Sequence, residues 1–340
     1  MSIINSKLPW AALACVLCAA GIETGLRLRF PWTCVGLEAL RNSLPSRKQF
    51  AVEAASYEAA LREYKGGGIV LVGGSDLREG VDTILLKELL GGKEVRVFGM
   101  TGQDPLDTLD QNDYFTDRRP DLLIVMSCRE GFYRGYMPRR LKYFLGVKGL
   151  RVLLETAHPR ELFKMRKDML DGLLGAVVFS LRYRETIRES LYARWGFRPR
   201  GSKEHGKGTA REDCWLHPLL EAQKAAFERE ALEMQRRGVP LMVVESPRRS
   251  DVLSGYPAEV SADYRAFSER MSHDHGLRWI AQEEMPAFNE KDFGDPRHLS
   301  ERGCEKFTRY LGSILMGSSF RRTSESRSLL DSGFRRGDGE

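Results

Sequence analysis

The chain has 340 residues and a formal net charge of +6, with 42% hydrophobic and 29% charged residues. These values are typical of folded soluble proteins and exclude a wholly disordered chain, a collagen and a multi-span membrane protein. Six cysteines are too few for a disulfide scaffold and form no zinc-binding pattern, so no metal site is expected. The length allows one large α/β domain or two small ones.

The first element expected along the chain is an apolar helix near the amino terminus. Residues 8–22 carry no charge, and the apolar run to Leu26 is interrupted by Glu23 alone. This length approaches the ~20 residues that a membrane-spanning helix needs. We expect a signal-anchor helix and its flank at residues 1–32; a cleaved signal peptide and a short buried helix are the alternatives. A helical linker is expected at residues 33–66.

Short apolar runs predict buried strands in the rest of the chain. The first run, GGIVLVGG at residues 67–74, is bounded by glycines at both ends. Similar runs occur at residues 95–98, 122–126, 152–154, 176–179 and 241–244. Longer amphipathic stretches between the runs predict helices. Alternating strands and helices predict βαβ units, and therefore a three-layer α/β/α sandwich around a mainly parallel sheet.

Two of the expected helices have clear ends. Residues 212–237 predict a long helix that Gly238 ends, and a second helix has apolar side chains at helical spacing before Gly276. The apolar positions of that second helix are Val260, Tyr264, Phe267 and Met271. The last stretch, residues 317–340, is rich in Ser, Arg and Gly, so we expect a disordered tail there and a folded domain over residues 67–316.

Positive charge is concentrated between Arg182 and Arg211, a stretch that contains nine Lys and Arg residues and three acidic residues. Such a patch can contact an anionic glycan, a phospholipid headgroup or a nucleic acid, although charge runs are commonly solvated surfaces. Because no nucleic-acid-binding module accompanies the run, we expect no nucleic acid among the partners.

Two separated motifs carry the candidate chemistry. Ser75 directly follows the first predicted strand in the sequence VGGSDLREG, and the preceding glycines permit the tight turn that exposes its hydroxyl. Near the end of the ordered chain, Asp295 precedes His298 by three residues in the sequence GDPRHLS. The carboxylate can hold the imidazole while the other ring nitrogen accepts a proton from serine.

With these motifs in this order, the chain resembles the SGNH (GDSL-type) hydrolase superfamily over about residues 67–316. The block GDPRHLSERGCEKFTRYL is similar to the closing block of membrane-anchored members, of the alginate O-acetylation and teichoic acid D-alanylation type. The resemblance implies a flavodoxin-like, SGNH-type sandwich. It also implies that Ser75 is the nucleophile, His298 the general base and Asp295 the residue that orients the imidazole.

The resemblance further implies an oxyanion hole, the set of donors that stabilises charge on the ester oxygen. Its backbone donors would be the N–H groups of Ser75 and Gly102, with Gly99 as the second choice for the latter. The asparagine that the family often carries after its third strand is missing, since the chain reads SCREGF there. Ser127 or Arg129 would then have to substitute.

The function implied is that of a serine-dependent ester hydrolase or O-acyltransferase. It would act on cell-envelope carbohydrate or lipid esters through an acyl-serine intermediate, with no cofactor. The implied location is the cell membrane, with a single pass and the catalytic domain outside the cytoplasm, or secretion after signal cleavage. Expected partners are the envelope polysaccharide or lipid ester, the membrane through the N-terminal helix, and a multi-span membrane acyltransferase. The alternative is a non-catalytic envelope assembly or anionic-glycan-binding protein on a degenerate SGNH scaffold.

Overall fold

The computed structural model describes residues 46–133, 141–178, 182–188 and 219–317, together with four single positions before residue 25. Apart from those four positions, the N-terminal helix expected at residues 1–32 lies outside the described residues, as does nearly all of the tail expected at residues 317–340. Within the described ranges, no helix is both long and apolar enough to cross a membrane.

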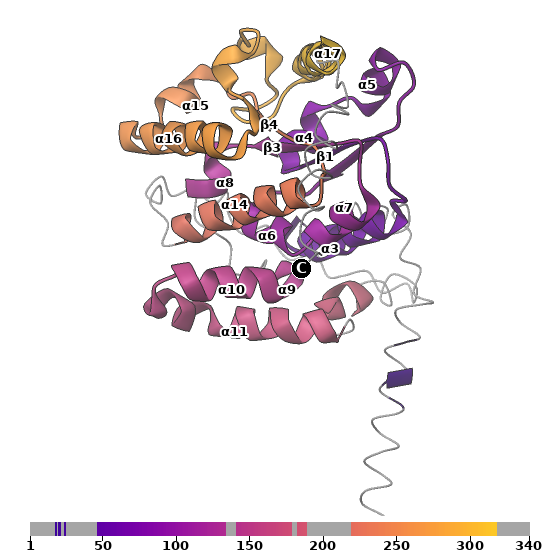
Figure 1. Ribbon diagram of the computed structural model, residues 1–340, viewed down its shortest axis with the longest axis vertical. Coiled ribbons are helices and arrows are strands. Elements are labelled where there is room, and N and C mark those ends of the chain that lie inside the picture. Colours follow the sequence, from indigo (N-terminus) through magenta and orange to yellow (C-terminus); the bar gives the residue numbers. More distant parts are fainter. Residues whose placement is uncertain are drawn as a thin grey trace, which may run out of the picture.

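A parallel sheet of five strands forms the centre of the molecule (Figure 1). The strand order is β2-β1-β3-β4-β5, and each neighbouring pair is parallel. The strands are β1 (Ile69–Gly73), β2 (Val95–Gly99), β3 (Leu122–Ser127), β4 (Leu241–Glu245) and β5 (Arg278–Ile280). This is the order of flavodoxin-like sheets, in which the chain reverses its direction of growth between β1 and β3. The expected α/β fold with a parallel sheet is confirmed.

Helices cover both faces of the sheet because successive strand side chains point to opposite sides. In β1, Ile69 and Leu71 join one apolar cluster, whereas Val70 and Val72 join another. The first cluster packs under α4 (Ser75–Gly80), α5 (Thr83–Leu89) and α17 (Glu301–Gly317). The opposite face is covered by α3 (Ser46–Glu63), α7 (Asn112–Arg118), α8 (Arg129–Tyr133), α14 (Leu220–Arg236) and α16 (Ala258–His275).

Further helices lie outside this sandwich. They are α6 (Pro105–Leu109), α9 (Leu141–Phe144), α10 (Val147–Thr156) and α11 (Pro159–Val177). A separate apolar cluster joins α6, α10 and α11 to the outer side of α14, whereas α9 packs in the cluster around α3, and Figure 1 shows α10 and α11 beyond α14 as seen from the sheet. The remaining short elements are α15 (Ser250–Ser254) and the 3-10 turns η2 (Gln282–Glu284) and η3 (Glu290–Asp292).

Two predicted strands are helical. Residues 152–154 lie within α10, and the run at 176–179 begins in the last turn of α11, while Phe179 is outside the described residues. Val152 and Leu153 are fully buried, so the apolar run does mark the core. A run of three or four apolar residues fits a buried helix turn as well as a strand, which explains both errors.

The helix predicted before Gly276 is confirmed as α16. Its four apolar positions are all buried against the sheet and α14. Gly276 caps the helix with a φ of +61°, a left-handed conformation that favours glycine. The other long helix, α14, begins at Leu220, and the residues predicted to precede it lie outside the described chain.

The segment expected as a helical linker belongs to the packed domain where it is described. Val52, Leu61 and Tyr64 of this segment lie in the same apolar cluster as Val70 and Val72 of β1. The folded domain therefore begins before residue 67, and α3 is one of its covering helices.

Candidate active site

The tight turn after β1 places Ser75 at the carboxyl end of the sheet. β1 ends at Gly73, Gly74 is the N-cap of α4, and Ser75 is its first residue. A Cβ atom on Gly73 would approach the Cβ and the carbonyl oxygen of Met126 to 3.0 Å, so the close approach of β1 and β3 requires glycine. The half-buried Ser75 hydroxyl thus faces the crevice where such sheets bind ligands.

The structure brings the three candidate catalytic side chains into one hydrogen-bonded chain. Ser75 Oγ lies 3.0 Å from His298 Nε2, and His298 Nδ1 lies 2.7 Å from Asp295 Oδ2. Asp295 Oδ1 accepts the backbone N–H groups of Arg297 and His298 at 2.8 and 2.9 Å. The loop that holds Asp295 and His298 is closed by a bridge between Phe293 and Leu299.

The environment of Asp295 keeps its carboxyl ionised. Partial burial raises the pKa of Asp295, but the hydrogen bonds from the His298 ring and from the two backbone N–H groups outweigh burial, so the pKa lies below its usual value. An ionised carboxylate accepts the Nδ1–H of the imidazole. That bond leaves Nε2 free to accept the Ser75 proton.

Further carboxylates lie near the imidazole. Asp76 Oδ1 lies 3.7 Å from His298 Nε2, and Glu79 Oε2 lies 4.0 Å from His298 Nδ1. The other Asp76 oxygen accepts a hydrogen bond of 2.6 Å from the buried guanidinium of Arg248. Asp76 was visible in the serine motif, but the motif itself gave it no role.

Two backbone N–H groups near the Ser75 turn are the candidates for the expected oxyanion hole. As the first residue of α4, Ser75 has an N–H with no acceptor inside the helix. Gly102 has a φ of +62°, and its nitrogen lies 3.9 Å from the position of a Cβ built on Gly74. Its N–H donates no backbone hydrogen bond to another described residue. The two expected donors therefore lie on adjacent turns.

Glu53 of α3 braces the loop that carries Gly102. The buried Glu53 carboxylate accepts the backbone N–H of Thr101 at 2.8 Å, the Thr101 hydroxyl at 2.9 Å and Arg78 Nη1 at 2.6 Å. These bonds connect α3, the loop after β2 and α4. Glu53 belongs to no motif in the sequence, and it lies 48 residues before the loop that it contacts, so the sequence did not indicate its role.

The substitutes proposed for the missing asparagine are engaged elsewhere. The Ser127 hydroxyl is buried and lies 3.1 Å from the Tyr264 hydroxyl. Arg129 contacts Ser261 at 3.2 Å and Glu283 at 3.5 Å, which turns it towards α16 and η2. Neither side chain contacts Ser75 or His298 in the described part of the chain. Gly99 is the last residue of β2, in register with Gly73 of β1, and Gly102 lies in the turn that follows.

The described residues contain no group of three His, Cys, Asp or Glu side chains placed to hold a metal ion. Outside the serine site, His273 lies 2.8 Å from its neighbour Asp274, and His275 lies 3.1 Å from Glu228. His273 therefore contacts a neighbour on α16, and His275 links α16 to α14.

Comparison with known proteins found no matching family model and no matching curated protein. Solved structures that are similar at low sequence identity include the following two. A lipase/acylhydrolase from Enterococcus faecalis has a TM-score of 0.40 and 12% identity, over 74% of this chain and 96% of that one. A catalytic mutant of an acetylxylan esterase from Geobacillus stearothermophilus has a TM-score of 0.36 and 10% identity, over 74% and 95%. Similarity at these TM-scores and identities does not indicate the reaction, which has to be inferred from the geometry of the site.

Proposed function

We propose that this chain is an SGNH-type serine ester hydrolase or O-acyltransferase. The observation that carries the proposal is the continuous chain from Ser75 Oγ through the His298 ring to Asp295, with links of 3.0 and 2.7 Å. Nucleophile, base and orienting carboxylate in hydrogen-bond contact define the arrangement that activates a serine. Ser75 lies at the carboxyl end of β1, the edge at which sheets of this type bind ligands.

The proposed reaction has two half-reactions. Ser75 Oγ attacks the ester carbonyl carbon while His298 Nε2 takes the hydroxyl proton. The N–H groups of Ser75 and Gly102 then stabilise the negative carbonyl oxygen. The tetrahedral intermediate collapses to an acyl-serine, and the leaving alkoxide takes the proton from His298. Water or a sugar hydroxyl attacks the acyl-serine, gives its proton to Nε2, and the Ser75 hydroxyl re-forms as the new acid or ester leaves.

We further propose cell-envelope carbohydrate or lipid esters as substrates, and a membrane location with the domain outside the cytoplasm. The support is the apolar run at residues 8–26 and the similarity of the closing motif to membrane-anchored members. If the reaction is transfer, a multi-span membrane acyltransferase is the proposed partner that supplies the acyl donor. In hydrolysis water attacks the acyl-serine, and in transfer a sugar hydroxyl attacks it.

Turnover of a small chromogenic acetate ester tests this proposal. Ser75→Ala should reduce kcat/KM by at least about 10³, because the nucleophile is lost. Ser254→Ala, which removes an exposed hydroxyl on α15, is the matched control and should act like the parent. Adding a soluble oligosaccharide as acceptor then distinguishes transfer from hydrolysis by the ratio of acetylated sugar to free acetate. Equal turnover by Ser75→Ala and the parent would refute the proposal.

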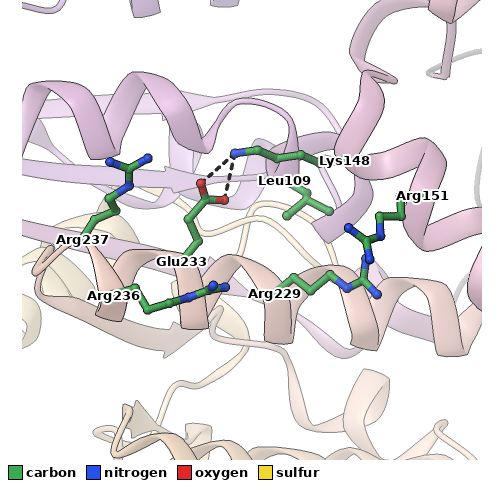
Figure 2. Close-up of a pocket in the computed structure, with 7 residues that line it drawn as sticks. All are labelled: Leu109, Lys148, Arg151, Arg229, Glu233, Arg236 and Arg237. Carbon is green, nitrogen blue, oxygen red and sulfur yellow. Dashed lines mark hydrogen bonds and ion pairs between the residues drawn. The ribbon is translucent and has the colours of Figure 1, made fainter.

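A second candidate function, binding of an anionic polymer without chemistry, is favoured by a basic cavity of about 320 Å³ away from the serine (Figure 2). It is lined by Leu109, Lys148, Arg151, Arg229, Glu233, Arg236 and Arg237. Glu233 binds Lys148 at 2.8 Å, and Glu155 binds both Arg151 and Arg229. Arg236 and Arg237 pair with no carboxylate in the described chain.

Retention on a polyanionic column tests this second function. Arg236→Gln combined with Arg237→Gln should elute at lower salt than the parent, whereas Arg166→Gln on α11 serves as a control for loss of a surface charge. Unchanged retention in the double variant would rule out this cavity as the binding site. The basic run at residues 182–211, which first suggested such binding, lies mostly outside the described residues.

A further inference from the structure

We propose that Arg248 is a positioning residue for the Ser75–His298 pair, and that its charge keeps Asp76 from holding the imidazole in its protonated form. This inference rests on the proposed serine chemistry and adds a residue that the sequence motifs did not indicate. Arg248 follows the carboxyl end of β4, the same edge of the sheet that carries Ser75 after β1. Loops at this edge line the crevice of a doubly wound sheet.

The Arg248 side chain is buried and its backbone is fixed. Only 5% of the side chain is exposed. Gln282 holds the backbone on both sides, since its Oε1 accepts the Arg248 N–H at 3.2 Å and its Nε2 donates to the Arg248 carbonyl at 2.7 Å. A buried charged group of this kind is stable only when its donors are paired.

The guanidinium connects α4, α8 and the loop that carries His298. Its Nη2 donates to Asp76 Oδ2 at 2.6 Å, next to the nucleophile. Its Nε lies 3.3 Å from Glu130 Oε1, just after β3. Its Nη1 donates to the Arg297 carbonyl at 3.2 Å, inside the loop between Asp295 and His298. One side chain therefore fixes the nucleophile turn relative to the loop that carries the base.

The contact with Asp76 has an electrostatic consequence. Asp76 Oδ1 lies 3.7 Å from His298 Nε2, the atom that must accept the Ser75 proton. A carboxylate at that distance stabilises a protonated imidazole, and a paired guanidinium reduces this effect. The charged groups that face the imidazole are Asp76 and Glu79 from α4 and Asp295 from its own loop. Arg248 acts through Asp76 from the loop after β4, and Arg297 lies 3.8 Å from Glu130 instead.

The pH dependence of Ser75 labelling distinguishes two roles for Arg248. In one role its charge and its hydrogen bonds act on the site, and in the other the side chain only fills space. The rate of labelling of the full chain by a fluorophosphonate probe is measured from pH 5 to 9. In Arg248→Met the unpaired Asp76 carboxylate should move the acid limb of the profile up by about one pH unit and lower the plateau rate. Arg248→Lys keeps the charge but not the planar fork, so its limb should stay near the parent's while its plateau falls.

Two variants at Asp76 complete the test. Asp76→Asn alone should move the acid limb to lower pH, a result that does not depend on whether Arg248→Met folds. Adding Asp76→Asn to Arg248→Met should return the limb to near the parent's position, because the two residues are coupled. Arg265→Met, an exposed arginine on α16, is the control and should leave the profile unchanged.

Failure of the Arg248 inference and failure of the serine chemistry give different results. An unmoved acid limb in both Arg248→Met and Asp76→Asn would overturn the inference, as would a limb that Asp76→Asn fails to restore in the double variant. Labelling of Ser75→Ala at the parent's rate is a different result, because it would reject the serine chemistry itself.

Discussion

Asp295 uses both of its carboxylate oxygens at once. Oδ2 faces the His298 ring, and Oδ1 is held by backbone N–H groups of the same loop. The carboxylate cannot rotate without breaking one of these sets of bonds, so the loop fixes the direction from which the imidazole is held. The tautomer of His298 follows, because an ionised carboxylate at Nδ1 requires the proton there.

Asp295→Asn tests this role. The amide oxygen can still accept the two backbone N–H groups, so the loop and the thermal stability should change little. The amide NH₂ would then face Nδ1 and favour the wrong tautomer, and the corresponding change in serine proteases costs about 10⁴ in rate. We expect kcat/KM for a small ester to fall by about 10²–10⁴. A kcat/KM within threefold of the parent would show that Asp295 does not orient the base.

Contacts between single residues were predictable from sequence where they are local. Asp295 and His298 lie three residues apart, so their contact could be expected from spacing alone. Arg248 could not be found this way, because its partner Asp76 lies 172 residues away. The Ser127 hydroxyl was expected to be available as a donor because its partner is also distant in sequence. That partner, Tyr264, lies 137 residues later.

Among elements, the contact of α14 with α6 buries an acidic group. Glu230 of α14 is 1% exposed and accepts the Thr108 hydroxyl of α6 at 2.7 Å. Burial raises the pKa of Glu230 to about 7, although the hydrogen bond from Thr108 opposes the shift. The folded chain therefore holds this proton more tightly than the unfolded chain does.

Stability should consequently fall as pH rises past the usual range of a glutamate. Below about pH 4.5 Glu230 is protonated in both states, and between about pH 4.5 and 7 only the folded state keeps the proton, so unfolding becomes easier as pH increases. A shift of this size corresponds to about 3 kcal/mol. Glu230→Gln stays neutral, so its stability relative to the parent should grow by that amount between pH 4.5 and 8.

Urea unfolding at a series of pH values measures this difference. Glu221→Gln, an exposed position on the same helix, is the control and should follow the parent at every pH. If the stability difference between Glu230→Gln and the parent is the same at pH 4.5 and pH 8, the buried carboxyl is not the source of the pH dependence.

Element prediction succeeded where a pattern was long and failed where it was short. The four apolar positions of α16 repeat over three turns, which leaves no alternative to a helix. The apolar run in α10 covers one turn, and β5 offers only three residues with an exposed Arg278 at one end. In α10 the run marks the core at Val152 and Leu153, whereas Leu154 is 60% exposed because consecutive helix residues point in different directions.

At the scale of the whole molecule, α3 is part of the folded domain, so the domain starts before residue 67. The buried side chains of α3 pack against β1, and Glu53 reaches the loop that carries Gly102. The sequence indicated a helix in this region but not its role, because its packing partners begin only with β1. The parallel sheet was predictable because it follows from alternating apolar runs and amphipathic stretches along most of the chain.

Two truncations test the boundary. Deletion of residues 1–32 should keep cooperative unfolding at the parent's temperature and should release the chain from membranes at high salt. Deletion of residues 1–66 also removes α3, which exposes the apolar cluster around Val70 and Val72, and should abolish cooperative unfolding. Circular dichroism and sedimentation with membranes provide the readouts. A cooperative, parent-like transition in the longer deletion would show that α3 is dispensable.

The most direct test of the account is to locate the covalent adduct of a fluorophosphonate probe by peptide mass spectrometry. We predict a single adduct on the peptide that contains Ser75, absent in Ser75→Ala and strongly reduced in His298→Ala, because the base must remove the serine proton before attack. Parent-like labelling of Ser254→Ala would show that the loss is specific. No adduct on the folded parent chain, or an adduct on a different serine, would contradict the assignment of Ser75 as the nucleophile.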